Sequence, residues 1–440
     1  MLNSQDPTES QPADATQGSS DVQLEQKSEQ QQEPVFAREK HIQYFKRTLQ
    51  MLPEPYSSMD THRMSLGMFA LGGLELLGVL EEVVSEVDRK AWVEWVYAQQ
   101  RVPAETDVED EESDPNAALY GFGGGPFSGL PFQERDNGQD NRGCECGPHT
   151  TTYDTSHITM TYTALLILLI LGDDLSRVAK EPILRALRKL QQPNGSFVPC
   201  LTDCESDMRF TFCAAAVSYM LNDCSGINQT NMLQYIRDCQ THEHGFSQSP
   251  HQEAQGGPSY CAVATLGLLG KEALQDQRTM IRDEANGEDE EAFERRKARA
   301  GFVDKEGFRR WSLQRQVTGF QGRINKATDT CYSFWIGGAL AVMGSMDLVN
   351  YSFNRGYLME TQHKMFGGFG KWVGTYPDDK AHTSLVPLIA STDVLHSYMG
   401  IASLALMNEP GIQPLDPRLN VSRRVLERLH TQSVFWRASN

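Results

Sequence analysis

Five side chains that can bind a metal ion or an anion lie within ten residues of one another. They occur in the stretch from Gly319 to Gly344, and they are Arg323, Lys326, Asp329, Cys331 and Tyr332. A thiolate and a carboxylate are ligands for transition metals, while cations and a phenol donate hydrogen bonds to anions. The stretch therefore predicts a site that holds a metal and an anion together.

A helix is expected to start at the same place. The segment from Tyr332 to Met343 is apolar, and Asp329 is a natural N-cap for a helix that begins near Thr330. The free N–H groups and the positive dipole end of that helix would then lie beside the five side chains. Because Asp329 and Cys331 are two residues apart, they cannot share one face of a regular helix and must straddle its first turn.

The stretch belongs to a repeat that is marked by glycine and phenylalanine. Gly195, Gly245, Gly319 and Gly368 follow helix ends that contain Gln or His, and a phenylalanine comes one or two residues later. The intervals are 50, 74 and 49 residues, and the longest one contains an acidic run. Without an insertion of about 25 residues there, the period is near 50, the length of two helices and their turns.

Each mark is followed by an apolar segment that we expect to be helical. The segments are Phe210 to Leu221, Tyr260 to Leu269, Tyr332 to Met343 and His396 to Met407, with an earlier copy from Met160 to Leu171. They are apolar nearly all round, which predicts an inner layer, whereas amphipathic helices such as Glu181 to Gln192 should lie outside it.

We expect these two-helix repeats to close into a ring, which gives an all-α fold. The inner helices start with polar or aromatic groups, such as Arg209, Tyr260, Cys331 and His396. A ring brings those starts to one rim, whereas an open solenoid would spread them along a groove.

The composition indicates a globular protein with acidic loops. The 440 residues are 39% hydrophobic and 9% aromatic, enough for a sizeable core in one large domain or two. The formal net charge of -18 argues against a nucleic-acid partner. Two runs, Glu105 to Asp114 and Asp283 to Glu294, hold seven carboxylates each, and we expect both to be solvated loops.

The apolar runs and the cysteines of the sequence favour a cytoplasmic location. The most apolar run, Ala164 to Leu171, is far shorter than the ~20 residues that span a bilayer, so it predicts a buried helix and no membrane span. Nine cysteines at uneven spacings, with no hydrophobic leader, favour a reducing compartment. Residues 1–35 are rich in Gln, Ser and Glu and should form a disordered tail.

A second candidate metal cluster occurs in the sequence CECGPH. It contains Cys144, Cys146 and His149, but it lies in a glycine-rich segment without a fourth ligand. We therefore interpret these residues as loop residues rather than as a second metal site.

Longer motifs extend from about His41 to Arg428. They read YFKRTLQMLP, SHITMTYTALLILLILGDDLSRV, DMRFTFCA, GRINKATDTCYSFWIG and GGFGKW. With these motifs the chain resembles the β subunits of the protein prenyltransferases, and within that family the type I geranylgeranyltransferases. The resemblance implies an α–α barrel, or toroid, of six helix pairs over residues 36–440, with insertions near 104–117, 281–300 and 379–391. It also implies a catalytic subunit that works as an obligate heterodimer with a separate α subunit.

The resemblance implies a zinc ion, one per β subunit. The family's zinc ligands map onto Asp329, Cys331 and His396. Each of these alone would be read as a helix cap, a small core residue or a satisfied histidine. Three protein ligands and one open position are the plan of a catalytic zinc site, and the open position would take the substrate's cysteine.

The leaving group in this family is diphosphate. Arg323, Lys326 and Tyr332 lie beside a helix N-terminus, which suits an anion, although basic residues before a helix are more often simply solvated. Lys371 in GGFGKW lies where farnesyl-transferring relatives have an aspartate that helps to hold magnesium. The resemblance therefore implies that Lys371 neutralises diphosphate charge and that magnesium is not required.

Gln255 stands where the family usually has a diphosphate-binding histidine, and an amide can donate a hydrogen bond but carries no charge.

The resemblance also suggests how lipid length is set. Farnesyl enzymes have a tryptophan at the position of Ser65, and a small residue there leaves room for a fourth isoprene unit. Met399 falls where the type I enzymes have a phenylalanine, so the pocket wall is expected to differ. Other positions that match residues near lipid or acceptor peptide are Arg209, His157, Met160, Phe210, Trp335 and Trp372. For the last three, aromatic core packing is the other interpretation.

The resemblance thus implies transfer of a geranylgeranyl group from geranylgeranyl diphosphate to the cysteine of C-terminal CaaX motifs, usually those that end in Leu. Rho-type small GTPases are expected acceptors. A farnesyltransferase β subunit is the nearest alternative, which Ser65 and Lys371 oppose, and a Rab-type transferase is a further one. A non-catalytic helical-repeat scaffold belongs to another class, and it predicts neither zinc nor diphosphate affinity.

Overall fold

The computed structural model describes residues 35–52, 54–103, 117–125, 144–145, 155–200, 204–283, 286–373 and 393–437. Residues from Val35 onward form one compact unit. The predicted N-terminal tail, the first acidic insertion and the insert near 379–391 lie outside the described residues, apart from Val35 and Ala117. Cys146 and His149 of the second candidate cluster also lie outside them.

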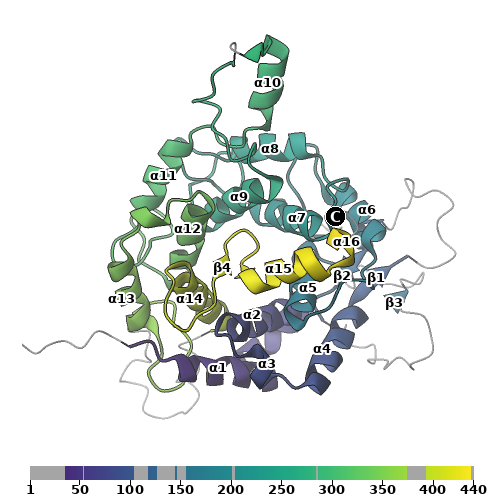
Figure 1. Ribbon diagram of the computed structural model, residues 1–440, viewed down its shortest axis with the longest axis vertical. Helices are drawn as coiled ribbons and strands as arrows, with labels where there is room; N and C mark the ends of the chain where they lie inside the picture. The colour runs from purple at the N-terminus through teal and green to yellow at the C-terminus, as the bar shows by residue number, and fades with distance from the viewer. Residues whose placement is uncertain are drawn as a thin grey trace, which may run out of the picture. The chain divides into compact units, whose positions relative to one another are not determined.

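Six apolar helices form a closed inner ring (Figure 1). Each packs against the next inner helix of the sequence, and the last packs against the first. In chain order they are α2 (Arg63–Leu76), α5 (Ile158–Leu171), α7 (Met208–Met220), α9 (Gly256–Leu269), α12 (Thr330–Val342) and α14 (Val394–Leu406). The expectation that the helices close into a ring is confirmed.

A second layer of helices surrounds the ring and alternates with the inner helices along the chain. In α6, Ile183, Leu184 and Leu187 are buried while Arg188 and Lys189 are exposed, as the amphipathic pattern predicts. Inner and outer helices together make the six pairs that the resemblance implies. The outer helices are α1 (Arg38–Gln50), α4 (Glu86–Ala98), α6 (Lys180–Leu190), α8 (Gln229–Asp238), α11 (Lys305–Leu313) and α13 (Tyr351–Thr361).

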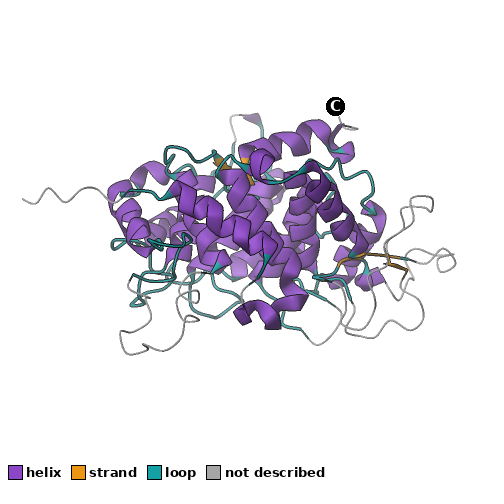
Figure 2. Ribbon diagram, turned by 90° about the horizontal axis from the view of Figure 1, so that it is seen from below, coloured by secondary structure: helices purple, strands orange, loops and turns teal. Residues whose placement is uncertain are grey.

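Short elements complete the fold, and Figure 2 shows how little of it is strand. The other helices in the described part of the chain are η1 (Glu54–His62), α3 (Leu80–Val83), η2 (Ala117–Leu119), α10 (Glu290–Arg299), η4 (Met346–Leu348), α15 (Arg423–Gln432) and α16 (Val434–Arg437). β1 (Gln100–Val102) pairs antiparallel with β2 (Gly121–Phe122) and parallel with β3 (Cys144–Glu145), and β4 (Leu415–Asp416) pairs antiparallel with β5 (Val421–Ser422). Among the described helices, none is long and apolar enough to cross a membrane.

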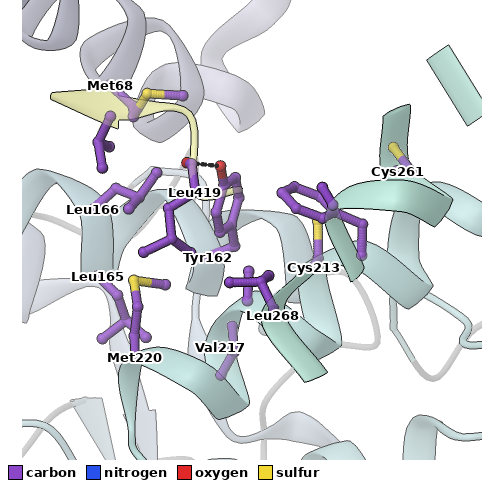
Figure 3. Close-up of a cluster of buried hydrophobic side chains, with 14 of the residues drawn as sticks. Met68, Tyr162, Leu165, Leu166, Cys213, Val217, Met220, Cys261, Leu268 and Leu419 are labelled. Atoms are coloured by element: carbon purple, nitrogen blue, oxygen red, sulfur yellow. Dashed lines mark hydrogen bonds between the residues drawn. The ribbon is translucent and has the colours of Figure 1, made fainter. Parts of the chain in front are cut away.

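Helix α5 shows why the apolar segments form the inner layer. Every residue of α5 except Thr159 is buried, so the helix has no side that favours water. Each fully buried aliphatic side chain contributes ~1.5–3 kcal/mol relative to exposure. Figure 3 shows Leu165 of α5 beside Met220 of α7 in this core. The helix ends at Gly172, whose φ of 87° is a left-handed conformation that favours glycine.

The predicted start of α12 near Thr330 is confirmed, whereas the other inner helices begin two to four residues before the apolar segments that marked them. Polar residues outside those segments cap the first turns: Asp207 accepts from the N–H of Arg209, and Asp393 accepts from the N–H of His396. A cap lets a helix extend into positions that apolar periodicity does not mark. These caps explain the difference in the helix starts.

The C-terminal segment lies across the ring, with α15 over its middle in the view of Figure 1. Three inner helices, α5, α9 and α14, each send a tyrosine hydroxyl to a carbonyl oxygen of this segment. The pairs are Tyr162 with Leu419 at 2.9 Å, Tyr260 with Pro417 at 2.8 Å and Tyr398 with Asn420 at 2.6 Å. The bond between Tyr162 and Leu419 appears in Figure 3.

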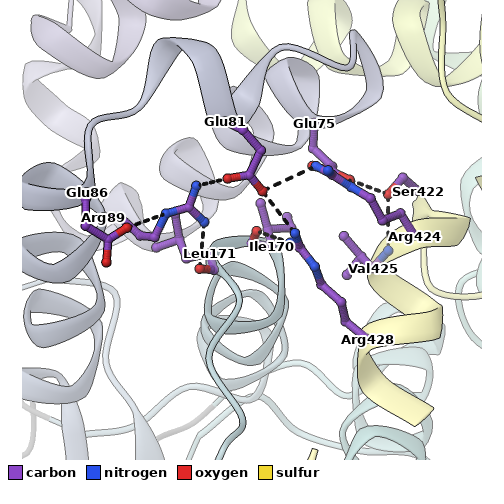
Figure 4. Close-up of polar contacts among 10 residues, drawn as sticks. All are labelled: Glu75, Glu81, Glu86, Arg89, Ile170, Leu171, Ser422, Arg424, Val425 and Arg428. Carbon is purple, nitrogen blue, oxygen red and sulfur yellow. Dashed lines mark hydrogen bonds and ion pairs between the residues drawn. The ribbon is translucent and has the colours of Figure 1, made fainter. Parts of the chain in front are cut away.

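A buried carboxylate fixes the same segment to the first inner helix (Figure 4). Glu75 of α2 is 1% exposed, and it accepts from Oγ of Ser422 at 2.7 Å and from Nε of Arg424 at 2.9 Å. Glu81 of α3 accepts from Arg428 of α15 at 3.0 Å. Because α15 follows the last inner helix, these contacts join the two ends of the ring's sequence.

The second acidic insertion contains a helix, so the expectation of a simple solvated loop was wrong there. Helix α10 begins after Asp289, which accepts from the N–H of Ala292 at 2.7 Å. Its first turn is acidic and its last turn is basic, an arrangement that complements the helix dipole. None of its residues is buried, and it projects outward from the ring in Figure 1.

Replacing Glu75 by Gln should destabilise the fold. The change removes the buried negative charge to which Arg424 and Ser422 donate hydrogen bonds. We therefore expect the free energy of unfolding to fall by roughly 1–3 kcal/mol. Glu291→Gln is the matched control, because its ion pair with Arg295 on α10 is exposed on both sides and such pairs contribute ~0–1 kcal/mol. Urea unfolding followed by circular dichroism measures both variants. Equal stability of the two would contradict the role of Glu75.

Candidate active site

Three predicted ligand side chains come together where α12 and α14 begin. Asp329, Cys331 and His396 place their ligand atoms within 4.8 Å of one another. All three are buried, and Nε2 of His396 lies 3.2 Å from Oδ1 of Asp329. The described part of the chain contains no other group of three His, Cys, Asp or Glu residues arranged in this way.

The local fold explains how the three side chains meet. Asp329 is the N-cap of α12, and its Oδ1 accepts from the N–H of Cys331 at 2.9 Å. Its own N–H donates to the carbonyl of Phe320 at 3.1 Å, which holds the chain before the helix. The cap turns its carboxylate back toward the first turn, where Cys331 lies. His396 reaches the same place because α14 packs against α12 in the ring.

Asp393 lies behind the histidine, and it was not among the site residues predicted from the sequence. Its Oδ2 lies 2.6 Å from Nδ1 of His396, and its Oδ1 accepts from the N–H of His396 at 2.8 Å. A carboxylate on the far nitrogen of a ligand histidine fixes the ring's orientation and increases its basicity. The available signal was an Asp three residues before a histidine at a helix start, which is a cap pattern.

The electrostatics of the cluster favour a cation. Burial raises the pKa of Asp329, but the hydrogen bonds with His396 and Cys331 outweigh that effect and lower it. Burial also works against a charged His396, yet the hydrogen bonds with Asp329 and Asp393 raise its pKa to about 12. Burial raises the pKa of Cys331 to about 11. The carboxylates thus hold positive charge inside the cluster.

This donor set fits zinc. It offers one carboxylate oxygen, one sulfur and one imidazole nitrogen, all of which zinc accepts, and a catalytic zinc site has three protein ligands. The carboxylate of Asp393 supplies the support that a ligand histidine needs. Asp329, Cys331 and His396 are therefore the residues that would hold the ion.

Lys371, one of the predicted anion-binding residues, lies beside the cluster of Asp329, Cys331 and His396. Its Nζ lies 3.8 Å from Oδ2 of Asp329 and 4.6 Å from the ring centroid of Trp372. Its carbonyl accepts from the N–H of Thr330, the first residue of α12, at 3.0 Å. The loop that carries Lys371 is thus fastened to the helix that carries Cys331.

Arg323 forms an ion pair with a residue that was not predicted from the sequence. Its Nη1 lies 2.7 Å from Oε2 of Glu253, two residues before Gln255. Gln255 is the N-cap residue of α9, and the next N–H of the chain, at Gly256, donates to the carbonyl of Gly322 at 2.8 Å. The start of α9 and the loop before α12 are therefore joined beside the cluster.

Tyr332 lies at this junction, packed against two glycines. A Cβ atom at Gly322 would come within 2.1 Å of its ring, and one at Gly256 within 2.8 Å. Burial raises the pKa of Tyr332 to about 12, so its hydroxyl is a hydrogen-bond donor at neutral pH. Lys326 lies on the same loop and is exposed.

The residues predicted to line the lipid and peptide sites form separate contacts on α2, α5 and α7. Oγ of Ser65 lies 3.5 Å from Sδ of Met160. The ring of His157 meets that of Phe210 edge to face at 5.9 Å, and the guanidinium of Arg209 lies 5.3 Å from the Phe210 ring centroid.

The other wall residues differ in exposure. Met399 is 1% exposed and belongs to the core, and Trp335 packs against Tyr260 at 5.1 Å. Trp372 is 45% exposed, which excludes core packing for this residue.

Removing the thiol of Cys331 should remove the metal. Cys331→Ala leaves two ligands, so we expect the purified protein to lose most of its zinc, while Cys224→Ala, which removes an exposed thiol, should retain it. Elemental analysis of the two purified variants measures the difference. Full zinc content in Cys331→Ala would rule out this cluster as the zinc site.

Comparison with known proteins gives the family. The chain matches the prenyltransferase alpha-alpha toroid domain over residues 36–421. The geranylgeranyl transferase type-1 subunit beta of Dictyostelium discoideum is 34% identical over 396 residues, which are 88% of this chain and 95% of the relative. The same subunit of Arabidopsis thaliana is 33% identical, over 88% of this chain and 89% of the relative.

More distant relatives share the fold. The protein farnesyltransferase subunit beta of Schizosaccharomyces pombe is 26% identical, over 82% of this chain and 79% of the relative. Among solved structures, Candida albicans protein geranylgeranyltransferase-I complexed with GGPP aligns with a TM-score of 0.67 at 22% identity, over 90% of this chain and 99% of that chain. The toroid, the extent of the family match and the identity to the type-1 relatives lead to one conclusion: this chain belongs to the prenyltransferase family, as a geranylgeranyl transferase type-1 β subunit.

Proposed function

We propose that this β subunit transfers a geranylgeranyl group from geranylgeranyl diphosphate to the cysteine of C-terminal CaaX motifs, usually those ending in Leu. In this reaction a carbon–sulfur bond forms at the allylic carbon, and the bond from that carbon to diphosphate breaks. The observation that carries the proposal is the buried group of Asp329, Cys331 and His396 with Lys371 beside it.

The metal part of the proposal rests on the donor set. Asp329, Cys331 and His396 would hold one zinc ion, and bound zinc would keep the acceptor cysteine as its thiolate at neutral pH. The protein's own task is to orient these ligands. Asp393 does so for His396, and the N–H of Cys331 does so for Asp329.

The leaving diphosphate would be stabilised by donors on α12 and on the loops beside its start. Lys371 and Arg323 carry positive charge, Tyr332 supplies a hydroxyl, and Lys326 and Gln255 lie on the adjoining loops. The N-terminus of α12 adds the positive end of its helix dipole. A lysine cannot bind magnesium, so Lys371 supports a reaction that does not require this ion.

The lipid would occupy the ring near Ser65 and Met160. The small side chain of Ser65 on α2 faces α5, and its Oγ lies 3.5 Å from Sδ of Met160. A 20-carbon lipid would extend past these two side chains. Phe210, Trp335 and Met399 would contribute apolar wall, and Arg209, His157 and Trp372 would lie near lipid or acceptor peptide. We assign these roles by their match to the family.

The proposed enzyme works with a separate prenyltransferase α subunit as an obligate heterodimer. Its acceptors are CaaX proteins, such as Rho-type small GTPases. The site depends on a reduced Cys331 and on a reduced acceptor cysteine, which supports a cytoplasmic location.

Turnover by the heterodimer tests the function. The chain co-purified with an α subunit should transfer the 20-carbon lipid to a peptide ending in Leu at least ~10-fold more efficiently than to peptides ending in Ser or Met. The same peptides are compared with 15-carbon farnesyl diphosphate. Preference for farnesyl diphosphate and Ser or Met would favour the farnesyltransferase alternative, while absence of zinc and of diphosphate binding would favour the scaffold alternative.

Enlarging Ser65 should change the preferred lipid. In Ser65→Trp the indole would fill the space beside Met160, so we expect kcat/KM to fall ~10-fold or more for the 20-carbon diphosphate and to change little for the 15-carbon one. Ser65→Thr is the control, because it keeps the hydroxyl and adds only a methyl group. Equal loss for both lipids in Ser65→Trp would show that Ser65 does not set lipid length.

A further inference from the structure

The loop from Gly367 to Lys371 connects the outer helix α13 to the candidate active site. Its far end is anchored to α12, since Oγ1 of Thr330 donates to the carbonyl of Gly370 at 2.7 Å and the N–H of Thr330 donates to the carbonyl of Lys371 at 3.0 Å. The N–H of Phe369 donates to Oγ of Ser397 on α14 at 3.0 Å. These bonds fix three residues of the loop. The N–H of Gly367 donates to the carbonyl of His363 at 3.1 Å and the carbonyl of Gly368 accepts from the N–H of His363 at 2.9 Å, so the N–H of Gly368 is left for another element to hold.

That element is α1, the first helix of the chain. The N–H of Gly368 donates to Nδ1 of His41 at 3.0 Å. Gly367 has a φ of 74° and lies so near α1 that a Cβ atom there would come within 2.1 Å of the carbonyl oxygen of Lys40. Arg47 donates to the carbonyl of Phe366 at 2.6 Å. Helix α1 therefore holds this loop although more than 300 residues separate them in the sequence.

The protonation of His41 is set by its other neighbours. Nε2 of Gln362 donates to the carbonyl of Val35, so its Oε1 faces the N–H of Ala37 at 3.1 Å and Nε2 of His41 at 3.2 Å. An amide oxygen only accepts, so Nε2 of His41 carries the proton and Nδ1 is free to accept from Gly368. Burial lowers the pKa of His41 to about 4, and the bond with Gln362 only partly offsets this, so the ring is neutral at physiological pH.

Ring stacking fixes the plane of the same imidazole. The His41 ring is parallel to that of Phe369, with centroids 4.6 Å apart and planes 6° apart, and its other neighbour is Phe36 at 5.0 Å. His41 is 0% exposed. Position, plane and tautomer are thus all determined, which is what a hydrogen-bond acceptor needs in order to hold a backbone N–H in place.

We propose that His41 is a positioning residue for Lys371: it accepts from Gly368, packs on Phe369 and so holds the loop that presents Lys371 to the diphosphate. This inference rests on the proposed function, because it takes diphosphate as the ligand of Lys371. It adds a residue from the first helix to a site that is otherwise built from α9, α12, α14 and their loops.

The test separates the acceptor of His41 from its ring. His41→Phe keeps an aromatic ring for the stack but leaves the N–H of Gly368 without its acceptor. His41→Asn loses the ring but places an amide oxygen near the position of Nδ1. His41→Gln places its amide near Nε2 instead, so it serves as a second acceptor-loss variant if His41→Phe does not fold.

The measurement is the affinity of the αβ heterodimer for geranylgeranyl diphosphate, in the wild-type and Lys371→Ala backgrounds. We expect His41→Phe and His41→Gln to weaken binding by about fivefold to tenfold and His41→Asn by no more than about twofold. In the Lys371→Ala background the same changes should have no further effect, because residues that act through one another are not additive. The KM for the acceptor peptide should stay within about twofold.

Other results would overturn either the inference on His41 alone or the diphosphate role of Lys371 as well. If His41→Phe weakens binding equally in both backgrounds, its effect is general and the inference is overturned. If Lys371→Ala weakens binding but the acceptor-loss variants do not, the inference fails while the proposed function stands. If Lys371→Ala itself leaves binding unchanged, the diphosphate role of Lys371 fails, and the inference fails with it.

Discussion

The closure of six apolar helices into a ring is the constraint on which the rest of this structure depends. Helices such as α5 are buried on nearly every side, so each needs a neighbour on both flanks. In an open array the first and last inner helices would each expose one flank. Packing of α14 against α2 removes both exposed flanks at once, and the contacts of Glu75 with Ser422 and Arg424 secure the same closure from the C-terminal segment.

Closure also determines where chemistry can occur. The inner helices follow one another around the ring in chain order, so their polar N-terminal caps lie in neighbouring positions. Asp329 and Cys331 come from one such start and His396 from the next, and α12 and α14 are neighbours because the ring places them side by side. Neither helix start alone has the three ligands. The carboxylate of Asp393 performs two tasks there, since it caps α14 and orients His396.

The sequence was sufficient for the parts of the fold that repeat. The glycine marks and the apolar segments are local patterns, so they predicted the inner helices and the ring, and the residue type of Asp329 predicted its role as the N-cap of α12. The starts of the other inner helices were less accurate because capping depends on single polar residues such as Asp207 and Asp393. Glu253 and His41 were missed for another reason: their partners, Arg323 and Gly368, lie 70 and 327 residues away, and no local pattern joins them. Helix α10 was missed because a high density of charge was taken to mean a loop, although acids in the first turn and bases in the last favour a helix.

The charges beside the cluster are closely balanced. Arg323 is engaged by Glu253, and Lys371 lies 3.8 Å from a carboxylate oxygen of Asp329, so both cations already face an anion. A neutral Gln255 adds no charge to either side of this balance. A cation bound by Asp329 would draw on the same carboxylate that attracts Lys371 and would weaken that attraction. In the proposed function, occupation of the metal site and the availability of Lys371 for an anion would therefore be linked through the carboxylate of Asp329.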